Sequence, residues 1–235
     1  MASITSAAVF GSTGHSGQYI LTSLLAMEST KTVYTFSRRA PKIESPKLSP
    51  LIERDGSKWA SSLSAIQPPP NVVLSALAMT HAEAGSTENK WKIDHDLNVD
   101  LAKAAKMAGV KIYVFISGAG ARSALGGYIS DMKMKRGVEE TIEELGFEHA
   151  VILRPGMILG QRETPHPIGP LLNGVIYSLG RITKSLQDRL GQEAEFVGRA
   201  AVRAAQIASD GRAPSKVWVI EGSDIVKLGE DTLGS

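Results

Sequence analysis

The sequence contains no cysteine among its 235 residues. This absence excludes a disulfide-stapled fold, a thiolate nucleophile and a metal site built on cysteine ligands. No apolar run approaches the ~20 residues that a membrane-spanning helix needs. The formal net charge of +2 is small and the basic residues are scattered, so no electrostatic footprint for nucleic acid is present. We therefore expect no transmembrane segment and no binding to nucleic acid.

The five histidines are dispersed and lack the short spacing of zinc ligands, so we expect no metal site. The first strand pattern begins within the first ten residues, which leaves no room for a cleaved targeting peptide before it. The expected location is therefore the cytosol, and attachment to an organelle surface stays open as an alternative.

A glycine pattern near the N-terminus is the strongest positive signal. An apolar run over 7–10 leads into three glycines spaced three residues apart, and an amphipathic stretch over 18–27 follows. A strand, a glycine turn and a helix in this order are typical of the dinucleotide fingerprint, in which the helix N-terminus holds the phosphates. The alternative is a turn used only for packing. The residues predicted to bind the cofactor here are Gly11, Ser12, Thr13, Gly14, His15, Ser16 and Gly17.

A second signal follows the next expected strand, residues 32–36. Ser37 leads there into Arg38 and Arg39, and no acidic residue stands at this strand end. A fold selective for NAD usually offers a carboxylate to the ribose at this point, whereas the 2′-phosphate of NADP needs cations. Arginine's planar fork suits a phosphate. The pair favours NADP(H) as the cofactor; the alternative is two solvated surface arginines.

Strand and helix patterns alternate along the rest of the chain. Short connections between them predict a parallel, doubly wound sheet, an α/β Rossmann fold, in a single domain over 1–235. The expected later strands are 71–74, 110–116, 150–153 and 217–220, and the expected later helices are 92–108, 132–145 and 195–209. Ligands of such a sheet bind beyond the carboxyl ends of its strands.

These strand exits place further residues at the cofactor: Ser75, Ala76, Leu77, Ser117 and Pro155. The polar segment 80–91 is expected to line one side of the cleft. Prolines interrupt the pattern over 161–190, which we interpret as a small C-terminal segment that covers the substrate.

Four stretches together carry a family resemblance: 11–17 (GSTGHSG), 37–42 (SRRAPK), 88–98 (ENKWKIDHDLN) and 153–162 (LRPGMILGQR). They resemble the atypical short-chain dehydrogenases/reductases over nearly the whole chain. The nearest resemblance is to small fungal proteins of the mitochondrial outer-membrane oxidoreductase-like group, related to Tat-interacting-protein oxidoreductases and NmrA-like proteins. It implies a Rossmann fold, NADP(H) binding, a reductase activity and, for an attached protein, the mitochondrial outer surface.

The resemblance also implies a catalytic serine after the fifth strand and a tyrosine with a lysine four residues beyond it. The tyrosine exchanges a proton with the substrate oxygen, and the lysine lowers the tyrosine pKa. This sequence departs from that pattern, since Ala119 stands where the serine is expected. Aligning the family's Lys-Met-Lys segment on 133–135 puts Asp131 in place of the tyrosine. Lys135, seven residues beyond Tyr128, returns to the helix face of Tyr128 if the helix starts that early.

Two histidines, His81 and His95, stand where such proteins more often carry arginine and tyrosine. A histidine can exchange a proton near neutral pH. The simpler alternatives are a surface role for His95 and a helix N-cap for Asp131. The candidate catalytic residues are therefore Tyr128, Lys135, Asp131 and His81.

Three functions are compatible with these residues. The first is an NADP(H)-dependent oxidoreductase that acts on a carbonyl or enone of a small, largely apolar molecule, with Tyr128 as the acid and Lys135 as its helper. The second is a redox-neutral isomerase or cyclase, which rearranges a secondary metabolite by acid catalysis, because proton transfer needs only one placed acid. The third is an NADP(H)-sensing regulator that binds a protein partner and turns nothing over. A small molecule is the expected ligand, and a homodimer is compatible with the sequence.

Overall fold

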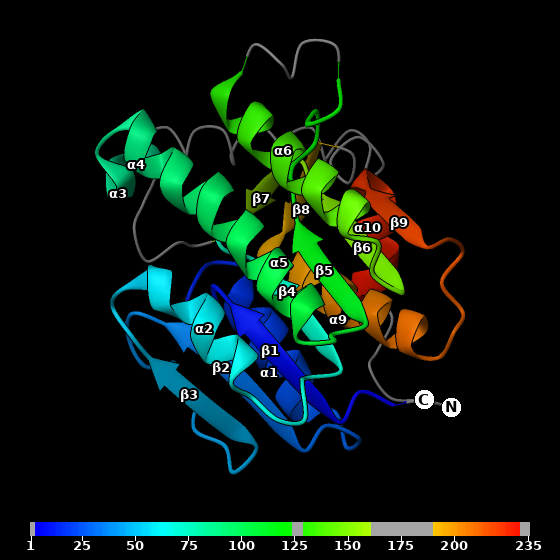
Figure 1. Ribbon diagram of the computed structural model, residues 1–235. Helices are drawn as coiled ribbons and strands as arrows, with labels where there is room; N and C mark the ends of the chain where they lie inside the picture. Colours follow the sequence, from blue (N-terminus) through cyan, green and yellow to red (C-terminus); the bar gives the residue numbers. More distant parts are fainter. Residues whose placement is uncertain (1–2, 124–128, 161–189, 231–235) are drawn as a thin grey trace.

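The computed structural model describes residues 3–123, 129–160 and 190–230 (Figure 1). A parallel sheet of seven strands forms its centre, in the order β3-β2-β1-β4-β5-β6-β9. The strands are β1 (Ser6–Phe10), β2 (Thr32–Ser37), β3 (Leu48–Ile52), β4 (Val72–Ser75), β5 (Ile112–Ile116), β6 (His149–Arg154) and β9 (Val217–Glu221). The expected α/β fold with a doubly wound parallel sheet is confirmed.

Helices cover both faces of the sheet (Figure 1). On one face lie α1 (Gly17–Ala26) and α9 (Ala194–Ser209), with α10 (Gly222–Glu230) packed on α9. On the other lie α2 (Trp59–Ser64), α5 (Asn98–Met107) and α6 (Ser130–Leu145). Further helical turns are η1 (Gly56–Lys58), α3 (His81–Ala84), α4 (Thr87–Trp91) and η2 (Lys92–Leu97). A separate pair of parallel strands, β7 (Met157–Leu159) and β8 (Gly191–Glu193), completes the described elements.

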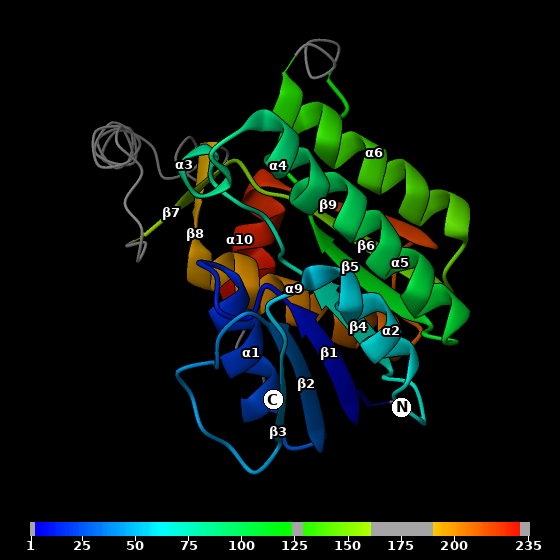
Figure 2. The same cartoon turned by 60° about the vertical axis from the view of Figure 1, so that its left-hand side comes forward.

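Strand β1 lies inside the sheet, between β2 and β4, and is apolar on both faces. Val9 packs in the core under α1 and α9, whereas Phe10 packs in the core under α2 and α5 and stacks on Phe36. This pattern is typical of parallel strands buried on both sides. The strand order reverses between β1 and β4, which is where ligands bind in such sheets. Figure 2 shows α3, β7 and β8 at the end of the molecule toward which the strands run.

Two local features go beyond what the sequence predicted. The segment 80–91 contains two short helices, the first of which begins at a capping box between Thr80 and Glu83. The helix expected over 92–108 begins with the π-helical turn η2, and only then continues as α5. The expectations for Tyr128 and for 161–189 lie outside the described residues; the last residue of the expected covering segment, Leu190, is exposed.

We expect Gly17→Ala to destabilise the protein, because a Cβ at Gly17 would lie 1.9 Å from the backbone oxygen of Gly11. Forcing an atom into a packed site costs about 1–3 kcal/mol. Gly56→Ala is the matched control, since its Cβ would meet only the Leu97 side chain, at 3.0 Å. Thermal unfolding measures both variants. Equal melting temperatures for Gly17→Ala and the unmodified protein would contradict this close approach.

Candidate active site

A cleft of about 440 Å³ opens at the carboxyl edge of the sheet. Its walls are formed by the glycine turn, by the exits of β4, β5 and β6, by α4 with η2, and by the first two turns of α6. Its lining includes Thr13, Gly14, His15, Ser16, Arg39, Ala76, Met79, Lys90, Asp94, Ser117, Gly118, Asp131, Met132, Lys135, Pro155 and Met157. Most of the residues predicted from the sequence to bind the cofactor therefore lie together around one cavity.

The glycine turn fits the pyrophosphate of a dinucleotide. Gly11 has a φ of +78°, and a Cβ there would lie 2.7 Å from the Ala76 oxygen. Only glycine allows this close packing of the turn on the β4 exit. Ser12 and Ser16 are buried, and within the described residues their hydroxyls have no hydrogen-bond partner. The N-cap residue of α1, Ser16, makes no capping hydrogen bond with its side chain, so the backbone N–H groups at this helix end can hold an anion.

The arginines at the end of β2 lie beside this turn. Arg39 lines the cleft, and its Nη2 donates a hydrogen bond of 3.4 Å to the Thr13 oxygen. The Ser37 hydroxyl donates to the Arg39 oxygen at 2.7 Å and so fixes the backbone after the strand. Arg38 is exposed next to them. A cationic side chain thus lines the cleft beside the glycine turn.

The side chain of Asn98 fixes the β4 exit through hydrogen bonds with Ser75 and Leu77. Ser75 is fully buried, and its hydroxyl donates to the Asn98 side-chain oxygen at 2.7 Å. The Asn98 amide group in turn donates to the Leu77 oxygen at 3.2 Å. Of the three residues expected at this exit, Ala76 lines the cleft. Ser75 and Leu77 support its backbone from beneath.

Asp131 and Lys135 line the opposite end of the cleft from successive turns of α6. His81 Nε2 lies 3.1 Å from Asp131 Oδ1, within hydrogen-bond distance. Lys135 is partly buried, and its Nζ donates to the Ile116 oxygen at 3.1 Å. Burial lowers the pKa of Lys135. Three of the four predicted catalytic residues therefore come together; Tyr128 lies outside the described residues, and its role stays a prediction.

Lys90 and Asp94 form a buried ion pair that also lines the cleft. The sequence did not reveal this pair. The side chains are 5% and 3% exposed. Lys90 Nζ donates to Asp94 Oδ2 and to the Met79 oxygen. Asp94 Oδ1 accepts from the Met79 N–H at 2.8 Å. The only sequence signal was a lysine four residues before an aspartate, a spacing that surface helices share.

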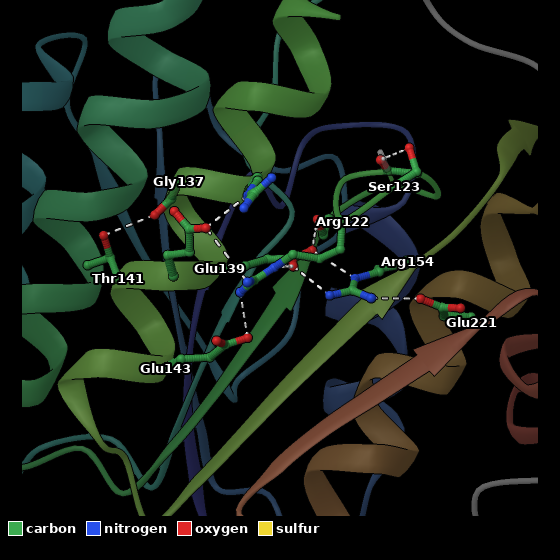
Figure 3. Close-up of polar contacts among 12 residues, drawn as sticks. Arg122, Ser123, Gly137, Glu139, Thr141, Glu143, Arg154 and Glu221 are labelled. Atoms are coloured by element: carbon green, nitrogen blue, oxygen red, sulfur yellow. Dashed lines mark hydrogen bonds and ion pairs between the residues drawn. The ribbon is translucent and has the colours of Figure 1, made fainter. Parts of the chain in front are cut away.

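A second group that the sequence did not reveal surrounds Glu139, a fully buried carboxylate on α6 (Figure 3). It accepts hydrogen bonds from the Ser117 hydroxyl at 2.5 Å, from Arg122 Nε at 3.0 Å and from Arg154 Nη2 at 2.7 Å. Burial alone would raise the pKa of the Glu139 carboxyl, but these donors outweigh it and lower that pKa. The group ties α6 to the exits of β5 and β6, which both border the cleft.

His95 does not line this cleft. Its ring lies 4.9 Å from the Trp91 ring and its Nδ1 lies 2.8 Å from Asp96, in a separate hollow beside α6. Among residues 3–123, 129–160 and 190–230, no cluster of three metal-ligating side chains occurs. No helix within the same ranges is long and apolar enough to cross a membrane.

We expect Glu139→Gln to lower the free energy of unfolding by about 3 kcal/mol at neutral pH, because Arg122 and Arg154 then keep only more exposed carboxylate partners, which include Glu143 and Glu221. Because the folded-state pKa of Glu139 is lowered, its contribution is full above the unfolded pKa and is lost as the pH falls through the folded pKa. The difference between the two proteins should therefore shrink in acid. Urea unfolding at several pH values measures it.

Glu143→Gln is the matched control for this measurement. Glu143 also accepts from Arg122, at 2.7 Å, but its side chain is 35% exposed, so its loss should cost less than about 1 kcal/mol. If both variants lose the same free energy of unfolding, the buried group around Glu139 contributes no more to stability than the exposed pair.

Comparison with known proteins identifies the class of protein to which this chain belongs. The sequence profile of a family described as NAD(P)H-binding matches residues 11–171. Three curated fungal proteins are similar over nearly their whole length. They are "Protein fmp52-2, mitochondrial" of Aspergillus terreus (51% identity, 97% of this chain and 98% of that protein), "Protein FMP52, mitochondrial" of Chaetomium globosum (54%, 94% and 95%) and "Protein fmp-52, mitochondrial" of Neurospora crassa (53%, 97% and 96%). The chain therefore belongs to the fungal FMP52 family of NAD(P)H-binding proteins.

The names of all three relatives place them in mitochondria. This finding contradicts the expectation of a cytosolic protein. That expectation rested on the lack of room for a targeting peptide before the first strand, and such a reading detects only cleaved leaders of the ordinary length.

Solved structures with this fold include the Bordetella bronchiseptica enzyme WbmH in complex with NAD⁺, with a TM-score of 0.69 and 17% identity over 96% of this chain and 79% of that one. Another is UDP-glucose 4-epimerase from Thermotoga maritima with UDP-glucose, with a TM-score of 0.63 and 16% identity over 85% and 72%. At these identities the likeness establishes the Rossmann-like fold alone.

Proposed function

We propose that the chain is a mitochondrial NADP(H)-dependent oxidoreductase that acts on a carbonyl or enone, or the corresponding alcohol, of a small, largely apolar molecule. The observation that carries this proposal is a single cleft lined both by the glycine turn and by Asp131, whose carboxylate is paired with the exposed side chain of His81. Methionine and alanine side chains between them, from Ala78, Met79, Met132 and Met157, suit an apolar substrate.

The cofactor preference rests on Arg39 and Arg38. The first lines the cleft beside the glycine turn, and no acidic residue follows β2 directly. A 2′-phosphate would meet cations there, whereas the ribose hydroxyl of NAD would lack its usual carboxylate partner. When bound, NADP(H) supplies the hydride acceptor or donor.

Proton transfer falls to the Asp131–His81 pair. Asp131 occupies the helix position four residues before Lys135, which the family resemblance gives to tyrosine. In alcohol oxidation, Asp131 accepts the hydroxyl proton, and His81, whose side chain is 60% exposed, passes it to water. In carbonyl reduction the same proton moves in the opposite direction. Lys135, bonded to the Ile116 oxygen, holds the first turns of α6 against the β5 exit.

A redox-neutral isomerase is the second candidate. The observation in its favour is the same Asp131 carboxylate in the tyrosine position, because a carboxylate is a suitable base for removing a proton from carbon next to a carbonyl. Such a reaction would leave the cofactor unchanged over complete turnover. The two candidates differ in whether NADPH is consumed in stoichiometric amounts.

Arg39→Ser should weaken NADPH binding about 10- to 100-fold, the loss expected for a charge-assisted hydrogen bond to phosphate. NADH binding should stay nearly unchanged, because NADH lacks the 2′-phosphate. Fluorescence titration of both nucleotides measures this difference. Arg212→Ser is the control, since Arg212 is exposed and pairs with Asp210 beyond α9. Equal weakening of NADPH and NADH would overturn the NADP(H) preference.

Asp131→Asn should lower the rate of NADPH oxidation by a panel of aldehydes, ketones and quinones about 100-fold or more, the usual weight of a general acid–base group. The NADPH dissociation constant should not change. Tyr128→Phe serves as the comparison, and we expect it to keep most of the activity. Full activity in Asp131→Asn together with loss of activity in Tyr128→Phe would contradict this role of Asp131 and identify Tyr128 as the proton-transfer group.

A further inference from the structure

Lys90 is a cation that is buried and yet borders the cleft. Its side chain is 5% exposed, and the cleft lining includes it. An ammonium group carries three N–H donors. Two of them bond to Asp94 Oδ2 and to the Met79 oxygen. For the third, the nearest carboxylate oxygen in the described structure is Asp131 Oδ2, at 3.8 Å, which is too far for a hydrogen bond.

This ion pair is not needed to fill the core. Two apolar side chains of similar volume usually stabilise a protein as well as a buried pair, because the pair loses its hydration. The pair also spans the junction of α4 with the π-helical turn η2, and π-helical turns are frequent at functional sites. Its two partners fix Lys90 Nζ in place, so the third donor has a set direction before any ligand arrives.

The β5 exit supplies no comparable donor to the cleft. Gly118 has no side chain, and the Ser117 hydroxyl donates its proton to the Glu139 carboxylate. Ala119, which stands where the family resemblance expects a serine, has no polar side chain either. Within the described residues, the β5 exit therefore offers a substrate oxygen beside Asp131 no free hydroxyl donor like the serine of the family pattern.

We propose that Lys90 is a catalytic residue that polarises the substrate oxygen, which lies between Lys90 Nζ and Asp131 Oδ2. This inference rests on the oxidoreductase function proposed above and adds no covalent step. Lys90 keeps all its protons and donates a hydrogen bond to the carbonyl or alkoxide oxygen, while Asp131 exchanges the proton with that oxygen. An oxygen about 2.8 Å from both atoms would bridge their separation. A fixed cation aimed at developing negative charge is an effective stabiliser of the transition state.

The test replaces both charges together, because Lys90→Gln alone would leave Asp94 buried and unpaired. The variant Lys90→Gln/Asp94→Asn keeps a neutral hydrogen-bonded pair. Lys92→Gln is the matched control: Lys92 lies two residues away, its side chain is 59% exposed, and it pairs with Glu88 on the surface. Thermal unfolding and the NADPH dissociation constant should stay the same in all three proteins.

Single-turnover reduction of an aldehyde found in the panel should slow on the order of 100-fold in the double variant and remain unchanged in Lys92→Gln. A second readout needs no turnover. The infrared C=O stretch of benzaldehyde, labelled with ¹³C at the carbonyl and bound with NADP⁺, should lie at lower frequency in the unmodified protein and in Lys92→Gln than in the double variant.

Equal C=O frequencies in the three proteins, or benzaldehyde that does not bind beside NADP⁺, would overturn the role of Lys90. So would an unchanged single-turnover rate in a folded double variant. Failure of the unmodified protein to bind NADP(H) at all would instead overturn the oxidoreductase function, and the role of Lys90 with it.

Discussion

One face of α6 carries three ionisable side chains at intervals of four residues, Asp131, Lys135 and Glu139, and the cleft depends on how each is compensated. Such spacing keeps them on one side of the helix, toward the carboxyl edge of the sheet. Lys135 donates a hydrogen bond to the β5 backbone. Glu139 accepts hydrogen bonds from Ser117, Arg122 and Arg154 (Figure 3). Because a buried charge without a partner is unfavourable, these contacts fix how α6 packs on the strand exits. Asp131, at the N-terminal end of the row, lines the cleft and pairs with the exposed side chain of His81.

The fold restricts the residue types at the two ends of the cleft in different ways. At the glycine turn the fold demands small residues and backbone N–H groups, which is why it keeps the pattern of dinucleotide-binding proteins despite low identity to the solved structures. At the other end the fold demands only that charges be paired. A carboxylate there can take the place of a phenol and a buried ammonium that of a hydroxyl without disturbing the sheet. The same fold can therefore support different chemistry.

The sequence was sufficient for the fold because its signals there are local. The apolar strand at 6–10 and the spacing of Gly11, Gly14 and Gly17 define the first crossover, and strand–helix alternation defines the parallel sheet. It was insufficient for the charged groups. Glu139 and Arg154 are far apart in the chain and meet only across the sheet edge, so no spacing relates them. The π-helical turn after Trp91 leaves no periodic signature over six residues, and the pairing of Lys90 with Asp94 resembled an ordinary surface pair.

The central claim is that one cofactor lies across the β1–β4 crevice with its phosphate end at Arg39 and its reactive end at Asp131. The most direct measurement is a crystal structure of the complex with NADP⁺. We predict that the 2′-phosphate contacts Arg39 and that nicotinamide C4 faces the space between Asp131 and Lys90. A nicotinamide ring turned away from that space, or a nucleotide bound elsewhere on the chain, would contradict the account.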